Sequence, residues 1–158
     1  MDVKNPFSEM SLIRDPHSVD AGGGLDKQND FFIEKNGEKF AGTHLIIDCL
    51  GCQNLSSLEV VEACFKKAIQ AANATLLHIH LHHFTPNGGI SGVAVLAESH
   101  ITIHSWPEHG FAALDVFMCG RADPHQTIDV IREAFEPEEL RLDEILRGKD
   151  AASWTSVG

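Results

Sequence analysis

The sequence predicts an α+β fold, a two-layer sandwich in which an antiparallel sheet carries two helices on one face. Three observations lead to this prediction. Segments with strand and helix patterns follow one another in the order strand, helix, three strands, helix, strand. The middle strands are joined by short turns, which is typical of antiparallel neighbours. The length of 158 residues fits one domain with a buried core.

The N-terminal part of the chain differs from the rest. Prolines, acidic residues and the glycine run 22–24 interrupt any apolar period, so we expect a flexible N-terminal extension over residues 1–41 that closes near residues 31–33. The folded domain is then expected to occupy residues 42–158. Its first element is expected to be a strand at 43–49.

The first helix is predicted from its start signal and its apolar face. The segment Ser56-Ser57-Leu58-Glu59 has the pattern of a capping box, in which a serine and a glutamate satisfy free backbone N–H groups. One apolar face follows at helical spacing, made of Leu58, Val61, Phe65, Ala68, Ile69 and Ala72. A strand is expected next at 76–84, where Leu77, Ile79 and Leu81 alternate with His78, His80 and His82.

Three further strands are expected at 91–97, 99–104 and 111–119. In the last of these, alternation sends Asp115, Phe117 and Cys119 to one face of the sheet and Leu114, Val116 and Met118 to the other. A second helix opens at Asp123-Pro124, turns Ile128, Ile131 and Phe135 inward and ends at Pro137. A final strand is expected at 140–146, and a helix there fits the pattern nearly as well.

Composition excludes several classes of protein. No apolar run approaches the roughly 20 residues that cross a bilayer, and residues 1–20 lack the continuous apolar stretch of a signal peptide. The formal net charge of -11 is opposite to that of nucleic-acid binders. We therefore expect a cytoplasmic protein that binds neither membrane nor nucleic acid. Its four cysteines, Cys49, Cys52, Cys64 and Cys119, are expected to be reduced.

The segment from Leu96 to Glu108 carries the strongest functional signal. It places a Glu98-Ser99 peptide bond next to His100 and His104, ahead of a stiff Trp-Pro turn. Two more segments, 84–93 and 113–120, flank it in the order and spacing of one family. Together the three segments resemble the S-adenosylmethionine decarboxylase proenzymes of the short prokaryotic, pyruvoyl-dependent type. The likeness is dense from Phe84 to Gly120 and weaker over about 42–148.

The resemblance implies that the chain cleaves itself between Glu98 and Ser99. A serine hydroxyl can attack the carbonyl just before it, and the resulting ester is eliminated after loss of the serine α-proton. The products would be a β chain of residues 1–98 and an α chain of residues 99–158 that begins with a covalent pyruvoyl group derived from Ser99. His104 matches the family's proton acceptor in processing, because a neutral imidazole takes a proton near pH 7. Ser91 matches the second processing residue.

The same resemblance implies the reaction of the processed enzyme. The pyruvoyl cofactor would form a Schiff base with the amine of S-adenosylmethionine and accept electrons as carbon dioxide leaves. Cys119 matches the proton donor of this step, and Glu108 and Phe84 match substrate contacts. The product, decarboxylated S-adenosylmethionine, serves spermidine and other polyamine biosynthesis. The family also implies a homodimer of αβ units, in which two protomers form a larger layered sandwich with active sites near their interface.

Two departures from the family pattern bear on the substrate. The family usually has Thr where this chain has Ser105, a change that keeps the hydroxyl. The loop 87–90 is one residue longer than the usual loop, which approaches the substrate. Some relatives decarboxylate ornithine or arginine instead, so these substrates stay open as an alternative.

Two alternative functions, from other classes of protein, would depend on the histidine-rich strand. Residues 78–84 nearly match the signature of histidine-triad nucleotide hydrolases, with His80 as nucleophile, but His83 stands where that signature is apolar. A metal-binding module could use the same histidines with Cys49 and Cys52, although one Cys-x-x-Cys pair without a second is a weak zinc signal. We expect no metal in a pyruvoyl-dependent enzyme.

Overall fold

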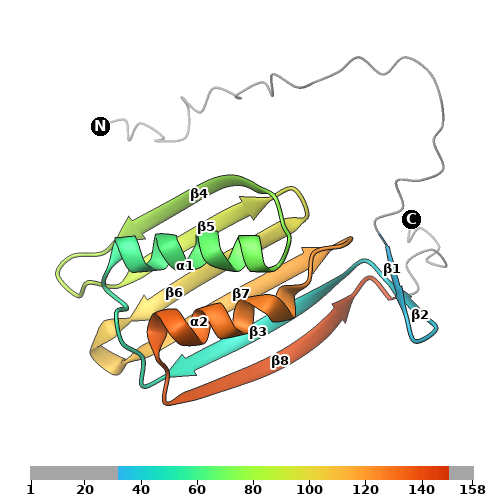
Figure 1. Cartoon of the computed structure of the whole chain (residues 1–158). Helices are drawn as coiled ribbons and strands as arrows, with labels where there is room; N and C mark the ends of the chain where they lie inside the picture. Colours follow the sequence, from blue (N-terminus) through green and yellow to red (C-terminus); the bar gives the residue numbers. More distant parts are fainter. Residues whose placement is uncertain (1–31, 150–158) are drawn as a thin grey trace, which may run out of the picture. The chain divides into compact units, whose positions relative to one another are not determined.

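A six-stranded antiparallel sheet, in the order β4-β5-β6-β7-β3-β8, is the main layer (Figure 1). The computed structural model describes residues 32–149. All the predicted strands are present, and the last element is a strand and not a helix. The bounds of the strands are β3 Gly42–Leu50, β4 Leu76–His83, β5 Ile90–Leu96, β6 Ser99–Trp106, β7 Phe111–Cys119 and β8 Glu139–Arg147.

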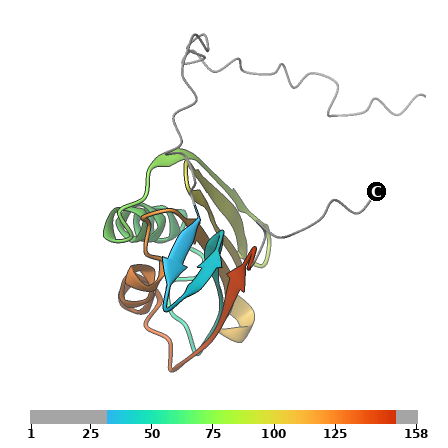
Figure 2. The same ribbon diagram turned by 90° about the vertical axis from the view of Figure 1, so that its right-hand side faces the viewer.

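Two helices, α1 Leu58–Ala71 and α2 Thr127–Phe135, cover one face of this sheet (Figure 2). The predicted two-layer α+β sandwich is therefore confirmed. Strand alternation works as predicted in β7, where Leu114, Val116 and Met118 are buried and Asp115 and Cys119 lie on the other side. The core between the layers also includes Leu45, Ile47, Val61, Phe65, Ala68, Ile69, Ala94, Ile101, Ile103, Ile131 and Phe135.

A small hairpin precedes the sheet, formed by β1 Ile33–Lys35 and β2 Glu38–Phe40. Its turn residues Asn36 and Gly37 have φ of 54° and 79°, the left-handed pair that a type I′ hairpin turn requires. The structure thus places strands at 33–40, where the sequence was expected to be flexible. The rest of the expected extension, residues 1–31, lies outside the described residues.

The N-cap of helix α1 lies one residue later than predicted. The N-cap is Ser57, whose hydroxyl accepts a hydrogen bond from the Val60 N–H at 3.3 Å. Glu59 is then the second residue of the helix, and its carboxylate accepts from the Ser57 hydroxyl at 3.0 Å. The predicted capping box of Ser56 and Glu59 is therefore wrong, because Ser57 takes the extended cap conformation and shifts the glutamate one position too close to the cap.

The predicted start at Asp123-Pro124 opens a 3₁₀ turn, η2 Pro124–Gln126, that leads into α2. Ile131 and Phe135 are buried as predicted, and Ile128 packs partly buried against the core. The helix ends at Phe135. Glu136 then adopts a left-handed conformation with φ of 44°, and Pro137 follows.

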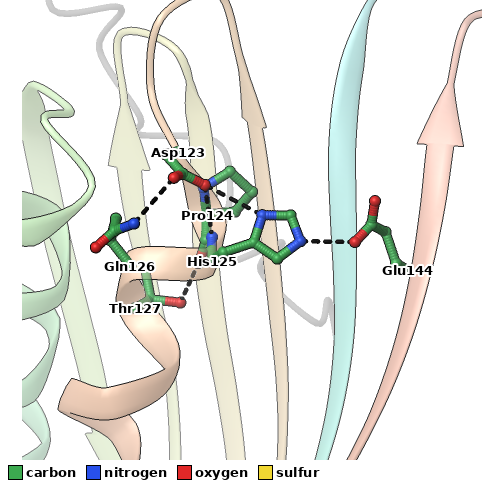
Figure 3. Close-up of polar contacts among 6 residues, drawn as sticks. All are labelled: Asp123, Pro124, His125, Gln126, Thr127 and Glu144. Carbon is green, nitrogen blue, oxygen red and sulfur yellow. Dashed lines mark hydrogen bonds and ion pairs between the residues drawn. The ribbon is translucent and has the colours of Figure 1, made fainter. Parts of the chain in front are cut away.

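His125 links this turn to the edge strand β8 (Figure 3). Its Nδ1 lies 3.1 Å from Asp123 Oδ1, and its Nε2 lies 2.6 Å from Glu144 Oε2. Partial burial by itself lowers the pKa of His125, but the bonds to the Glu144 and Asp123 carboxylates outweigh it, and the pKa is raised above its usual value. The imidazole therefore joins the η2 turn to the sheet through the Glu144 carboxylate, while Asp123 of the same turn holds the ring.

Neither α1 nor α2 covers the second face of the sheet (Figure 2). We call it the open face; it carries His100, Thr102 and His104 of β6 and Asp115, Phe117 and Cys119 of β7, as the pairing of these strands places them. Its exposed apolar side chains include Ile46 at 38%, Val95 at 41% and Ile145 at 44%.

Candidate active site

The Glu98-Ser99 peptide lies where β5 turns into β6. The hydroxyl of Ser99 contacts the carbonyl oxygen of Glu98. This carbonyl belongs to the peptide bond at which the sequence predicts cleavage. Only Ala97 and Glu98 connect the two strands, so Ser99 opens β6 directly after the turn. The nucleophile and the carbonyl that it would attack are thus adjacent on a short, tightly held connection.

Cys119, at the end of β7, holds the same carbonyl oxygen. Its backbone N–H donates a hydrogen bond to the Glu98 oxygen at 3.2 Å, and its Sγ lies 2.7 Å from that oxygen. The Ser99 Oγ is 3.7 Å from Cys119 Sγ. Two donors therefore point at the oxygen that would gain negative charge when a hydroxyl attacks, which is the geometry of an oxyanion hole.

A second cluster lies at the other end of β6. Ser91 of β5 pairs with His104 of β6 across the sheet, and the Ser91 Oγ lies 2.8 Å from His104 Nδ1. This contact holds the imidazole ring through Nδ1, so Nε2 can contact another group. The sequence prediction that Ser91 and His104 act together agrees with their contact, although the contact alone assigns neither residue a role.

The Ser91-His104 pair opens on a hollow of about 160 Å³. Phe84, Asn87, Trp106 and Glu108 line it as well, so both predicted substrate contacts lie here and not at Ser99. Trp106 stacks on Phe111 with ring centroids 5.3 Å apart. The hollow is smaller than the roughly 300–1,000 Å³ of ordinary ligand pockets.

The two clusters are far apart within one protomer. Ser99 begins β6 and His104 follows five positions later, so about 17 Å of extended strand separates them at about 3.4 Å per residue. A proton acceptor must come within about 3 Å of its target. The structure therefore brings together Glu98, Ser99 and Cys119, and separately Ser91, His104, Phe84 and Glu108, but does not join the two sets.

Between the clusters, the open face carries a polar group that the sequence did not single out. His44 Nε2 lies 2.9 Å from Asp115 Oδ1, and Thr102 donates to Asp115 Oδ2 at 3.4 Å. Burial, and next the charge of His44, lower the pKa of His100 beside them. These residues come from three neighbouring strands, and period-two alternation with the strand order would have been the only signal for them.

The residues of the two rival readings lie apart. Cys49 and Cys52 are buried, and burial, with the nearby Cys52 thiol second, raises the pKa of Cys49 to about 12, so it stays a neutral thiol at pH 7. His78, His80 and His82 are exposed along β4. Within residues 32–149, no three His, Cys, Asp or Glu side chains are grouped so as to hold a metal ion. No helix of this part of the chain is long and apolar enough to span a membrane.

Comparison with known proteins identifies the family. The family profile for S-adenosylmethionine decarboxylase matches residues 43–148, which includes both clusters. The chain belongs to the S-adenosylmethionine decarboxylase family. A proenzyme of this family from Thermomicrobium roseum is 44% identical over 111 residues, covering 70% of this chain and 96% of the relative. Another, from Thermodesulfovibrio yellowstonii, is 47% identical over 110 residues, covering 68% and 81%.

The fold agrees with the family. The crystal structure of an adenosylmethionine decarboxylase from Aquifex aeolicus is similar with a TM-score of 0.63 at 34% identity, and the match covers 69% of this chain and 92% of that one. The relatives are S-adenosylmethionine decarboxylase proenzymes, which supports the decarboxylase reading and neither the nucleotide hydrolase nor the metal-binding module.

Proposed function

We propose that this chain is a self-processing S-adenosylmethionine decarboxylase that cleaves itself between Glu98 and Ser99. The proposal rests on the surroundings of the Glu98 carbonyl. Its oxygen accepts a hydrogen bond from the Cys119 N–H and contacts the Ser99 hydroxyl. The chain also belongs to the S-adenosylmethionine decarboxylase family. The residues present suit a group made from Ser99, because the nucleophile, the carbonyl and the donors to its oxygen are already in contact.

In the first step, the Ser99 hydroxyl attacks the carbonyl carbon of Glu98. A C–O bond forms, the C–N bond of the peptide breaks, and the hydroxyl proton ends on the released amine, which leaves an ester. Negative charge grows on the Glu98 oxygen during the attack. The Cys119 N–H at 3.2 Å stabilises this charge, and removing one such donor typically costs about 10²–10³ in rate.

In the second step, His104 accepts the α-proton of residue 99, and the ester C–O bond breaks. Glu98 leaves as the new carboxyl end of the β chain, and water then releases ammonia from residue 99 to give the pyruvoyl group. Ser91 holds the His104 ring through Nδ1 at 2.8 Å. The free Nε2 is then the proton acceptor.

This step requires a homodimer, since His104 and Ser99 of one chain are about 17 Å apart along β6. A two-fold axis through the open face would set the end of β6 of one protomer over the start of β6 of its partner. The exposed Ile46, Val95 and Ile145 would then be covered. Each active site would combine Ser99 and Cys119 of one protomer with Ser91, His104, Phe84 and Glu108 of the other, within a larger layered sandwich.

The second protomer would also complete the substrate pocket, whose half in one chain measures about 160 Å³. Phe84 offers an aromatic face to the substrate and Glu108 a carboxylate for hydroxyl groups. When formed, the pyruvoyl group supplies an electron sink for the electrons that carbon dioxide leaves behind. Cys119 then gives a proton to the substrate carbon. The product would feed spermidine and other polyamine biosynthesis in the cytoplasm.

Release of labelled carbon dioxide tests the proposed activity. Purified protein is given carboxyl-labelled S-adenosylmethionine, ornithine or arginine, with Ser99→Ala as the inactive control. Release from S-adenosylmethionine alone supports the proposal. Release from ornithine or arginine instead would indicate that the longer loop at Asn87, which lines the hollow, changes the substrate specificity. No release from any of the three by a cleaved wild-type chain would contradict the decarboxylase activity.

A further inference from the structure

The side chain of Glu98 is bound on the side away from Cys119 by Thr75, a residue just ahead of β4. The Thr75 N–H donates to Glu98 Oε2 at 2.9 Å, and the Thr75 hydroxyl donates to Oε1 at 3.1 Å. The N–H of Ala97 donates in turn to the Thr75 carbonyl at 3.0 Å. One threonine thus makes three hydrogen bonds to the two residues that precede the cleavage point.

Glu98 is therefore held at both ends of the residue. Thr75 holds its carboxylate from the start of β4, and the Cys119 N–H holds its carbonyl from the end of β7. These strands lie on either side of the β5-β6 pair. A carboxylate that accepts one bond on each oxygen is fixed in direction as well as position, and such charge-assisted bonds are stronger than neutral ones.

We propose that Thr75 is a positioning residue for self-cleavage. The Thr75-Glu98 contact sets the plane of the scissile peptide against the Ser99 hydroxyl and the Cys119 N–H. Thr75 touches none of the reacting atoms, so its effect passes through Glu98. The inference rests on the proposed function, because it assigns Thr75 a part in the cleavage of the bond between Glu98 and Ser99.

The physical reason is the steep dependence of an attack on geometry. An intramolecular attack is fast only when the reacting atoms are held about 3–3.5 Å apart with the carbonyl turned toward the nucleophile. Within the two-residue connection between β5 and β6, the Cys119 N–H holds the carbonyl of Glu98, and Thr75 holds its side chain. Loss of the Thr75 hydroxyl removes one of the two bonds to the carboxylate and loosens that peptide.

The experiment measures cleavage of freshly synthesised chains over time by intact mass. Thr75→Val keeps the shape and the backbone N–H but removes the hydroxyl, and Thr75→Ser restores the hydroxyl. Gln70→Ala, on the exposed surface of α1, is the matched control. We expect Thr75→Val to cleave at least about tenfold more slowly, with Thr75→Ser and Gln70→Ala within about twofold of the wild type.

Two further measurements separate positioning from a merely structural role. Thermal unfolding of each uncleaved chain, made in a Ser99→Ala background, should differ little between Thr75→Val and Gln70→Ala. In a double-mutant cycle, Glu98→Ala combined with Thr75→Val should cleave about as slowly as the slower single variant, because both changes break one contact.

Cleavage of Thr75→Val at the wild-type rate would overturn the inference, and so would fully multiplicative effects in the cycle. Slow cleavage that Thr75→Ser fails to rescue would also count against it. If Thr75→Val fails to fold, Glu98→Ala decides instead, since it also removes the contact: slow cleavage supports the inference and cleavage at the wild-type rate overturns it. A wild-type chain that never cleaves would instead contradict the proposed function.

Discussion

At the scale of single residues, Cys119 has two separable duties in the proposed mechanism. Its backbone N–H donates to the Glu98 oxygen at 3.2 Å, and its thiol lies 2.7 Å from the same oxygen. Only the thiol depends on the side chain. Self-cleavage should therefore survive a change of side chain better than the later proton transfer to substrate.

Replacement of Cys119 by alanine tests this division. We expect Cys119→Ala to cleave at 98/99, because the N–H remains, and to decarboxylate about 10²–10⁴-fold more slowly per pyruvoyl group, since a positioned acid contributes about that much. Intact mass measures the first quantity and carbon dioxide release the second. Full turnover by the variant would remove Cys119 from the role of acid.

Ser105 shows how a buried hydroxyl supports the same region. It is 7% exposed, accepts from the Ile90 N–H at 2.8 Å and donates to the Leu55 carbonyl at 3.0 Å. Ser105→Ala leaves both backbone groups without this partner, and we expect the free energy of unfolding to fall by about 1–3 kcal/mol. Urea denaturation in a Ser99→Ala background measures it. A change below 0.5 kcal/mol, an order-of-magnitude threshold, would show that water replaces the hydroxyl without cost.

At the scale of elements, His125 makes the attachment of η2 to β8 depend on pH. Its folded-state pKa is raised by the Glu144 and Asp123 carboxylates against the effect of burial. Because the pKa of His125 is raised in the folded state, the contact stabilises the fold fully when the pH is below the pKa of the unfolded state, about 6.5. The contribution is lost as the pH rises through the higher folded-state value.

A comparison of the wild type with His125→Gln over a range of pH tests this contact, with both chains in a Ser99→Ala background. The wild type should be more stable at pH 5.5, by less than about 1 kcal/mol because the side chains are largely exposed. The gap should close by pH 8.5. A gap that is constant from pH 5.5 to 8.5 would contradict the charged contact.

Strand periodicity predicted the elements well, and local turn chemistry accounts for the failures. The sequence pattern located five strands of the main sheet, left the sixth, at 140–146, open between a strand and a helix, and assigned the faces of β7 correctly. The hairpin at 33–40 was missed because its Asn36-Gly37 turn lies in polar surroundings that resemble the segment before it. The cap of α1 was misplaced by one residue because two serines adjoin, and only backbone conformation decides between them.

The candidate site was only partly predictable for a geometric reason. The family resemblance pointed to Ser99, His104, Ser91 and Cys119, but five positions along a strand separate the first two of these residues by about 17 Å. The role of Thr75 depends on a contact across 23 positions of the chain, which no local pattern encodes. Alternation had placed Asp115 on this face, but only the strand order brings His44 of β3 beside it.

At the scale of the whole molecule, the proposed dimer predicts complementation between two inactive chains. Neither Ser99→Ala nor His104→Ala should cleave alone. In a mixed dimer, the His104→Ala chain keeps its own Ser99 and receives His104 from the partner, so it should be cleaved. Co-expression of differently tagged chains, followed by intact mass of the mixed species, measures this. Mixed dimers in which the His104→Ala chain stays whole would contradict the shared site.

Self-cleavage is the central claim, and the intact mass of the purified wild-type protein under denaturing conditions tests it most directly. The account predicts two fragments, residues 1–98 with a normal carboxyl end and residues 99–158 beginning with a pyruvoyl group in place of Ser99. Ser99→Ala should give one full-length mass. A wild-type chain that remains a single mass of 158 residues, or that is cut at another bond, would contradict the account.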